Sequence, residues 1–297
     1  LINVNKVNGF LYGLLSSASF GLIPLFTIPA MHQGMPFWSI LLYRFLFAML
    51  ALACILLLDK QSFRIRRKEI LPLLLLAFLY DCSAVFLFWG YKFMSSGVAT
   101  TIHFMYPLAV ALAMMCFFRE KGSVWVFAAI GMSIVGAVLL SLGNVDFTRG
   151  NTTLGMVSAA VSVVSYGGYI VGVRKSRAVG IDSTVLTCYV MGLGALYFIA
   201  GGLVTGGIRI ETDGTAWLCI LGVALPATAV SNMTLVQAIK RIGPTLTSVF
   251  GALEPLTAVV IGVAVFGEPF TVQGAAGILL IVAAVTIVIL HSGRRKA

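Results

Sequence analysis

Charged residues are scarce in this chain. Only 10% of its 297 residues are Asp, Glu, Lys or Arg, whereas 60% are hydrophobic. A soluble domain carries about a quarter charged residues, because its surface faces water. The mean hydropathy is +1.03, and no polar stretch is long enough to form a separate domain. The composition therefore argues against a soluble protein and indicates an outer surface that faces lipid.

Motifs for catalysis, metal binding and nucleotide binding are also missing. The five cysteines stand singly inside apolar segments without CxxC spacing, which favours packing over metal or redox chemistry. Neither a GxxxxGK[ST] loop nor an HExxH cluster occurs. Tyr80-Asp81 matches one half of an intramembrane aspartyl protease, but Ala195 follows Gly192-Leu193-Gly194 where the second acid would stand. We therefore expect no enzyme, no cofactor and no metal site.

Long apolar segments are plentiful. A membrane-spanning helix needs about 20 predominantly apolar residues. The residues before the first segment are too few and too polar for a signal peptide, so we expect that segment to be a retained helix. The segments that qualify are 9–30, 37–58, 70–91, 97–118, 123–142, 152–173, 183–206, 215–239, 244–266 and 271–291. The sequence thus predicts an all-α integral membrane protein with ten transmembrane helices.

Lys and Arg are distributed unevenly between the two sides of these predicted spans. With the N-terminus inside, sixteen of them fall in inner segments, and only Lys92, Arg149 and Arg209 fall outside. Such an asymmetry predicts that both termini are cytoplasmic. The net charge of +10 then reflects topology and contact with anionic lipid. Because the basic residues are spread over six segments, nucleic-acid binding is not expected.

The two halves of the sequence resemble each other. With an offset of 148, Pro107 matches Pro255, and Lys92, Leu108, Phe118 and Glu120 match Lys240, Leu256, Phe266 and Glu268. With an offset of 146, Gly9, Ser16, Ser19 and Gly21 match Gly155, Ser162, Ser165 and Gly167. The sequence therefore predicts two five-helix repeats, residues 1–146 and 147–297.

The second repeat is predicted to be inverted in the membrane. Five helices are an odd number, so Lys92 falls outside and the equivalent Lys240 inside. Two similar, oppositely oriented halves can exchange conformations and expose a central site to each side in turn. This symmetry favours a transporter over a sensor or an assembly factor, which would have no need of it.

The chain resembles the ten-helix EamA-type carriers of the drug/metabolite transporter superfamily. The resemblance is carried by residues 42–46, by Pro107 with Glu120, by residues 254–256 and 266–269, and by Gln273, Gly274 and Gly277. It implies a basket of helices around a central cavity, with helices 5 and 10 outside it. The chain also resembles the YddG-type amino acid exporters through Tyr80-Asp81, Tyr106 before Pro107, and Tyr166. This resemblance implies export of amino acids, including aromatic and other bulky apolar ones.

Ionisable side chains at membrane depth cost free energy, so each is a functional candidate. Four fall inside the predicted spans. Asp81 and Glu254 are near the midplane, and Arg44 and His103 are nearer the outer face. The structural alternatives are an ion pair between Arg44 and Asp81, and a neutral His103 that hydrogen-bonds a neighbouring helix.

Polar and aromatic residues line one face of several predicted helices, and these faces are expected to converge. The predicted substrate-binding residues are Tyr80, Asp81, His103, Tyr106, Tyr166, Asn232 and Glu254. We expect His103 or a backbone N–H to bind a substrate carboxylate, and Asp81 or Glu254 to bind an ammonium. Pro107 and Pro255 are predicted to kink their helices at equivalent points. Packing is the alternative role for these prolines and for the serine stripes.

The sequence predicts a secondary transporter of the cytoplasmic membrane for small amphipathic metabolites, and the resemblance to the amino acid exporters implies that it exports amino acids or similar metabolites. The alternative is an exporter of lipophilic cations, in which Asp81 or Glu254 exchanges the cation for a proton. Proton exchange would make transport depend steeply on pH. The expected partners are a small-molecule substrate and membrane lipid; the oligomeric state is left open, and a monomer is compatible with the sequence.

Overall fold

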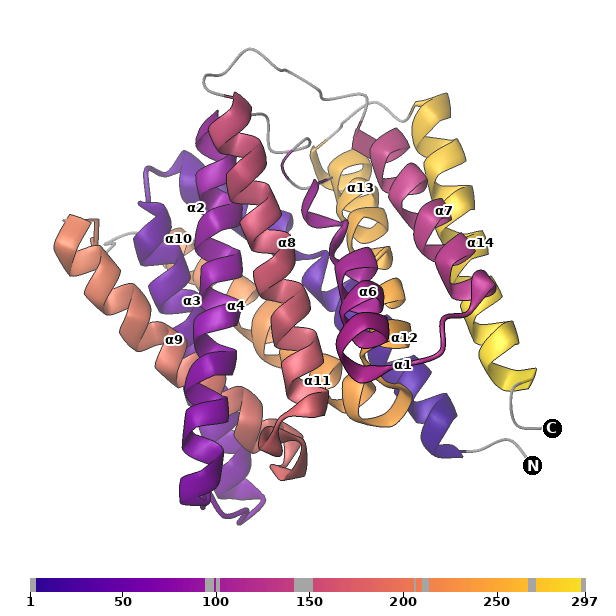
Figure 1. Ribbon diagram of the computed structural model, residues 1–297. Helices are drawn as coiled ribbons and strands as arrows, with labels where there is room; N and C mark the ends of the chain where they lie inside the picture. The colour runs from indigo at the N-terminus through magenta and orange to yellow at the C-terminus, as the bar shows by residue number, and fades with distance from the viewer. Residues whose placement is uncertain are drawn as a thin grey trace.

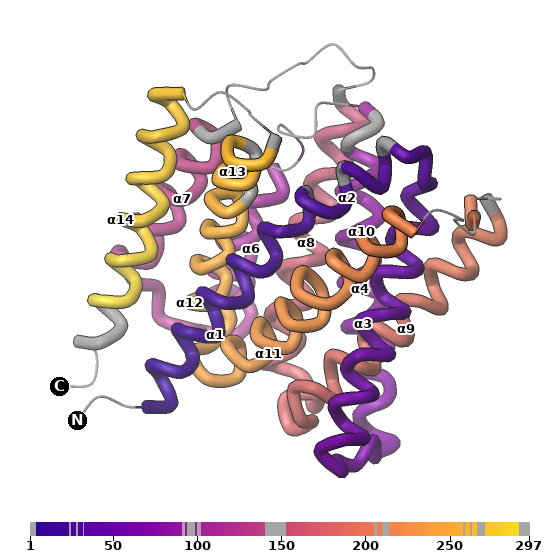
Figure 2. The backbone as a smooth tube through the Cα atoms, turned by 180° about the vertical axis from the view of Figure 1, so that it is seen from behind, coloured from indigo at the N-terminus to yellow at the C-terminus, as the bar shows by residue number. Residues whose placement is uncertain are grey.

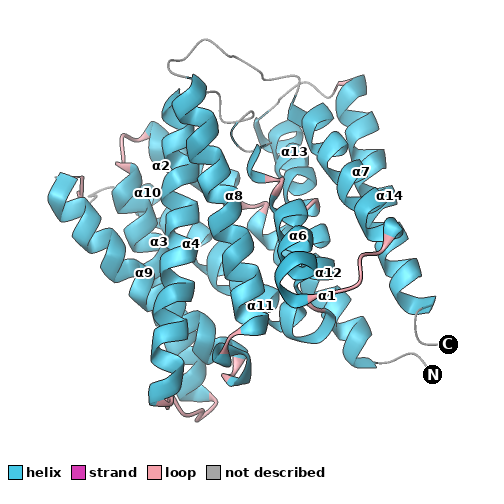
Figure 3. Cartoon of the chain, viewed as in Figure 1, coloured by secondary structure: helices cyan, strands magenta, loops and turns pink. Residues whose placement is uncertain are grey.

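Helices make up the regular structure of the computed structural model, which describes residues 4–93, 99, 102–141, 152–205, 207–209, 214–266 and 271–294 (Figure 1). Within these residues no strand occurs, and Figure 3 shows helices joined by short loops. Arg149 and Glu268, which entered the sequence argument, lie outside the described residues.

The helices follow the predicted spans closely. They are α1 (Val4–Phe20), α2 (Ile23–His32), α3 (Phe37–Leu58), α4 (Arg67–Phe93), α6 (Tyr106–Phe118), α7 (Val124–Ser141), α8 (Thr152–Lys175), η2 (Arg177–Gly180), α9 (Ser183–Thr205), α10 (Gly214–Ala224), η3 (Leu225–Val230), α11 (Ser231–Ile242), α12 (Pro244–Phe250), α13 (Leu253–Phe266) and α14 (Val272–Arg294). Among the described residues, eight helices are long and apolar enough to cross a membrane, and Tyr106–Phe118 and Val124–Leu139 are shorter apolar helices. The prediction of an all-α membrane protein with ten spans is confirmed.

Helix packing follows the internal repeat. Helix α4 packs on α8, and α1 packs on α11. In the repeat, α1 is equivalent to α8 and α4 to α11, so these two contacts are symmetry mates. Figure 2 shows α1 beside α11 on the face opposite to the view of Figure 1. Helix α3 packs on α9, and α7 on α14, which are the equivalent second and fifth helices of the two halves.

Helices α7 and α14 lie at one side of the molecule (Figures 1 and 2). The start of α1 and the end of α14 lie at the same end, together with the connections from α3 to α4 and from α11 to α12. We call this the terminal end. The shared position of these segments follows from the even number of spans.

Large apolar side chains face outward along the helices. Val204 is 88% exposed, Phe117 79% and Leu279 70%. Soluble proteins rarely expose contiguous apolar surface on this scale, so lipid must cover it. The interior holds the aromatic and polar side chains, among them a core cluster that joins α3, α4, α8 and α9.

Candidate substrate-binding site

The fourth span is interrupted near its middle. Phe104 and Met105 form a turn, and α6 begins directly afterwards at Tyr106 with Pro107 in its first turn. Proline suits this position because the first N–H groups of a helix have no intrahelical partner. The sequence predicted one segment over 97–118 with a kink at the proline. The structure shows a turn just before it.

The ninth span is interrupted at the equivalent point. Helix α12 ends at Phe250, Gly251 and Ala252 form a turn, and α13 begins at Leu253. Glu254 lies in the first turn of α13, where the positive end of the helix dipole favours a carboxylate. The two interruptions bring the starts of two helices to the centre of the bundle, an arrangement that transporters use to bind polar ligands.

A hydrogen bond joins the two interrupted spans. The Tyr106 hydroxyl donates to Glu254 Oε1 at 3.3 Å, and the side chains are 2% and 7% exposed. A β-carbon at Gly251 would overlap the Tyr106 hydroxyl. The glycine therefore gives the ring the space to lie against the α12–α13 turn.

Four tyrosines and His103 gather around this bond. The Tyr166 ring lies 4.7 Å from Tyr106 in an edge-to-face arrangement and 5.4 Å from His103, measured between centroids. Tyr80 continues the cluster, at 6.1 Å from Tyr166 and 5.0 Å from Tyr169. All of these side chains are buried. The structure thus brings together the predicted residues Tyr80, His103, Tyr106, Tyr166 and Glu254.

His103 contacts Ser162 of α8, which is itself hydrogen-bonded to Ser83 of α4. Its Nδ1 lies 2.8 Å from Ser162 Oγ, and the Ser162 hydroxyl donates to the Ser83 carbonyl at 2.8 Å. A hydroxyl carries a single hydrogen, so Nδ1–H is the donor to Ser162. In the neutral imidazole Nε2 is then an acceptor.

Arg44 does not pair with Asp81. Its Nε donates to Thr228 Oγ1 at 2.5 Å, and its guanidinium lies over the rings of Phe20 and Phe45 at 5.6 and 5.9 Å. The ion pair considered from the sequence is therefore wrong. Arg44 is 5% exposed and reaches the centre of the bundle from α3.

Asp81 points between α4 and α9. A β-carbon on Gly194 would lie 2.6 Å from Asp81 Oδ1 and 2.6 Å from the Phe45 ring. Both carboxylate oxygens are buried and have no hydrogen-bond partner among the described residues. Asp81 therefore faces α9 and not the Tyr106–Glu254 bond, although it follows Tyr80 directly in the sequence.

The eighth span contains a π-helix, η3, between α10 and α11. Thr228 lies within it and donates to the Val223 carbonyl at 2.7 Å, while its oxygen accepts from Arg44. Asn232 Nδ2 donates to the Thr228 carbonyl at 2.9 Å, and Asn232 Oδ1 has no partner among the described residues. Arg44, a functional candidate in the sequence, and Thr228 were not among the predicted substrate-binding residues. Pro226, inside a predicted span, was the sequence feature that indicated an irregular helix here.

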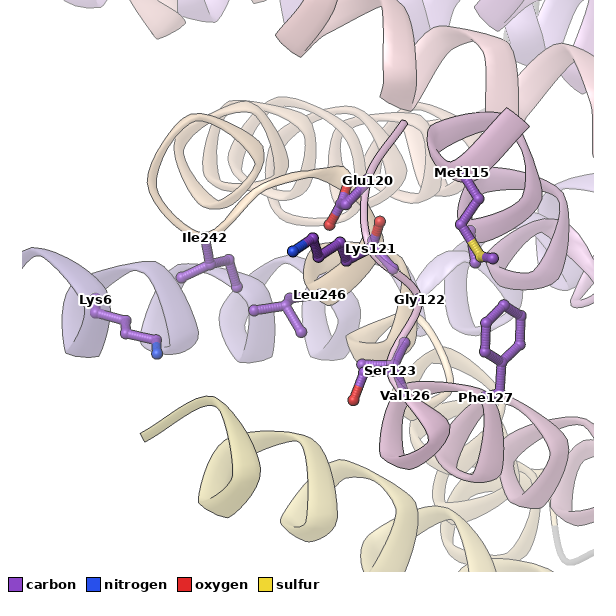
Figure 4. Close-up of a pocket in the computed structure, with 12 residues that line it drawn as sticks. Lys6, Met115, Glu120, Lys121, Gly122, Ser123, Val126, Phe127, Ile242 and Leu246 are labelled. Atoms are coloured by element: carbon purple, nitrogen blue, oxygen red, sulfur yellow. The ribbon is translucent and has the colours of Figure 1, made fainter. Parts of the chain in front are cut away.

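A cavity of about 160 Å³ lies at the terminal end, among α1, α6, α7 and the connection from α11 to α12 (Figure 4). Its lining includes Lys6, Glu120, Lys121, Ile242 and Thr245. None of the predicted substrate-binding residues lines it. The predicted substrate-binding side chains are buried in the interior. No group of three or more potential metal-ligating side chains occurs among the described residues.

Comparison with known proteins agrees with this architecture. A solved crystal structure of another protein matches with a TM-score of 0.85 at 17% identity, covering 98% of this chain and 100% of the other. At this identity the likeness shows the fold alone. No curated protein gives a significant sequence match. The model of the EamA-like transporter family matches twice, over residues 7–142 and 153–290. The chain therefore belongs to the EamA-like transporter family and is a membrane transporter of small metabolites.

Proposed function

We propose that this protein is a secondary carrier that exports amino acids, including aromatic and other bulky apolar ones, across the cytoplasmic membrane. The observation that carries the proposal is the tyrosine cluster around the Tyr106–Glu254 hydrogen bond. Tyrosine rings offer apolar faces to a hydrophobic side chain and hydroxyls to a polar end. A carboxylate at this depth provides a partner for the α-ammonium of an amino acid.

Alternating access is supported by matched contacts in the two halves. Ser162 of α8 donates to the Ser83 carbonyl of α4 at 2.8 Å, and Ser231 of α11 donates to the Ser16 carbonyl of α1 at 3.1 Å. Ser16 and Ser162 are equivalent in the repeat, as are Ser83 and Ser231. Each of these bonds crosses from one half to the other and joins the same pair of equivalent positions, with donor and acceptor exchanged. Such symmetry supports two halves of similar structure, which alternating access requires.

The proposed orientation places the terminal end in the cytoplasm. The predicted inner basic segments around Lys6, Arg64, Lys121 and Arg241 all belong to this end. Positive residues favour the cytoplasmic side of a membrane.

The test is transport by purified protein in liposomes. Labelled Phe, Trp, Met and Thr are compared with a cationic dye, with and without a proton gradient. Saturable movement of amino acids supports the proposal. Glu254→Gln should then lower this flux roughly tenfold or more, because a charge-assisted hydrogen bond to the ammonium is lost. Glu69→Gln, at the first turn of α4, is the matched control.

A second candidate is a proton-coupled exporter of lipophilic cations. It is favoured by the same aromatic cluster around a buried carboxylate, since aromatic rings and an acid also suit an organic cation. Movement of the dye alone, and only with a proton gradient, would favour this candidate and refute amino acid export.

A further inference from the structure

Arg44 is a buried cation without an anionic partner in the described part of the chain. It is 5% exposed, and its Nε donates a hydrogen bond to the neutral hydroxyl of Thr228. Asp81 faces Gly194, and Glu254 is bonded to Tyr106. Charges buried in proteins are as a rule paired, since removing an ion from water without a partner costs several kcal/mol. Among the described residues, no acidic side chain pairs with this buried positive charge.

The surroundings of Arg44 orient the guanidinium without neutralising it. The rings of Phe20 and Phe45 lie near it, from α1 and from α3. Thr228 fixes Nε from the π-helix. Single π-turns inside helices occur frequently at functional sites, where they present a side chain that a regular helix would turn away. The chain therefore maintains an irregular backbone where it contacts Arg44.

Arg44 and Glu254 flank the same tyrosines. The Arg44 guanidinium lies over the Phe45 ring, which is 5.6 Å from the Tyr80 ring between centroids. Tyr80 lies in turn 6.1 Å from Tyr166. Tyr166 packs against Tyr106, which hydrogen-bonds Glu254. The tyrosine cluster therefore has a cation on one side and a carboxylate on the other.

We propose that Arg44 binds the carboxylate of the transported substrate while Glu254 binds its ammonium, so that the site selects zwitterions. This inference rests on the proposed function as an amino acid carrier. A guanidinium binds a carboxylate through two parallel hydrogen bonds, which gives both strength and orientation. Arg44 thereby takes the role that the sequence analysis gave to His103 or a backbone N–H. The substrate side chain then lies among Tyr80, Tyr106 and Tyr166.

The experiment measures competition in proteoliposomes. Exchange of labelled phenylalanine is inhibited with unlabelled phenylalanine, with phenylalanine amide, which lacks the carboxylate, and with 3-phenylpropanoate, which lacks the ammonium. In the unaltered protein we expect phenylalanine to compete at least about tenfold better than the amide, the effect of one charge-assisted bond. In Arg44→Gln this preference should disappear. In Glu254→Gln the preference over the amide should remain, and the preference over 3-phenylpropanoate should fall.

Arg64→Gln is the control, since Arg64 is exposed in the connection between α3 and α4. Equal competition by phenylalanine and its amide in the unaltered protein would overturn the inference, and so would an unchanged preference in Arg44→Gln. If Arg44→Gln fails to fold, Arg44→Lys tests the role of Arg44 instead. Lysine retains the charge but cannot form the paired bonds, so the preference should shrink, and an unchanged preference would refute the assignment.

The two proposals fail in different ways. If the protein exchanges phenylalanine but ignores the carboxylate, the proposed function stands and the role of Arg44 is wrong. If it exchanges no amino acid at all, the proposed function fails, and the role of Arg44 fails with it.

Discussion

Tyr106 and Glu254, which share a hydrogen bond, occupy equivalent positions in the two repeats, 148 residues apart. Each precedes a proline and lies in the first turn of the helix that follows an interrupted span. The bond therefore crosses the pseudo-two-fold axis that relates the halves. A contact between equivalent positions belongs to neither half, and it maps onto itself when the two halves exchange conformations.

Tyr106→Phe should destabilise the protein by removing this hydrogen bond while keeping the ring. Loss of one hydrogen bond costs about 1 kcal/mol and should lower the melting temperature by about 2–4 °C. Thermal unfolding of the purified protein in detergent measures the change. Tyr197→Phe is the matched control, because the Tyr197 side chain is exposed on α9. A Tyr106→Phe variant as stable as the unaltered protein would show that the bond contributes nothing to this conformation.

Gly251→Ala should disturb the same contact sterically. The added β-carbon would overlap the Tyr106 hydroxyl, so the ring must move, at about 1–3 kcal/mol. Gly131→Ala is the control, because a β-carbon there would meet nothing within 4 Å. In a helix such as α7 that change should be neutral or stabilise by about 0.5–1 kcal/mol. Equal melting temperatures for the two variants would contradict the packing of Tyr106 on Gly251.

The helices could be predicted from the sequence because lipid imposes a length and an apolar character on each span. The segment 37–58 agrees with α3 to the residue, since Pro36 and Asp59 bound its apolar run. The repeat was visible because matched prolines and charges recur at constant spacing. Both features are local or periodic, so both can be recognised in the sequence without knowledge of tertiary contacts.

The partners of the ionisable residues could not be predicted in the same way. Tyr80 and Asp81 are neighbours in sequence, but successive residues on a helix point about 100° apart. One therefore joins the tyrosine cluster, and the other faces Gly194. The π-helix around Thr228 changes the face that each later residue presents. A count of residues that assumes regular helices could not place Thr228 against Arg44.

Asp81→Asn should affect transport far less than Glu254→Gln. The Asp81 carboxylate faces Gly194 and Phe45, so we expect it to make no contact with a substrate that lies among the tyrosines. Initial rates of amino acid exchange in liposomes compare the two variants. Asp81→Asn should retain most of the rate, whereas Glu254→Gln should lose roughly tenfold or more. An equal loss of exchange rate in both variants would show that Asp81 does contribute to the substrate site.

The proposed orientation predicts a labelling pattern for cysteines introduced on either side of α3. Gln33 and Gln61 are exposed residues that flank this helix, so they lie on opposite sides of the membrane. In intact cells, a maleimide that cannot cross the membrane should label Gln33→Cys and not Gln61→Cys. In inside-out vesicles the pattern should reverse. The unaltered protein is the control for its own five cysteines. The opposite pattern would invert the topology, and the tyrosine cluster would then be approached from the cytoplasm through the α2–α3 end and not through the terminal end.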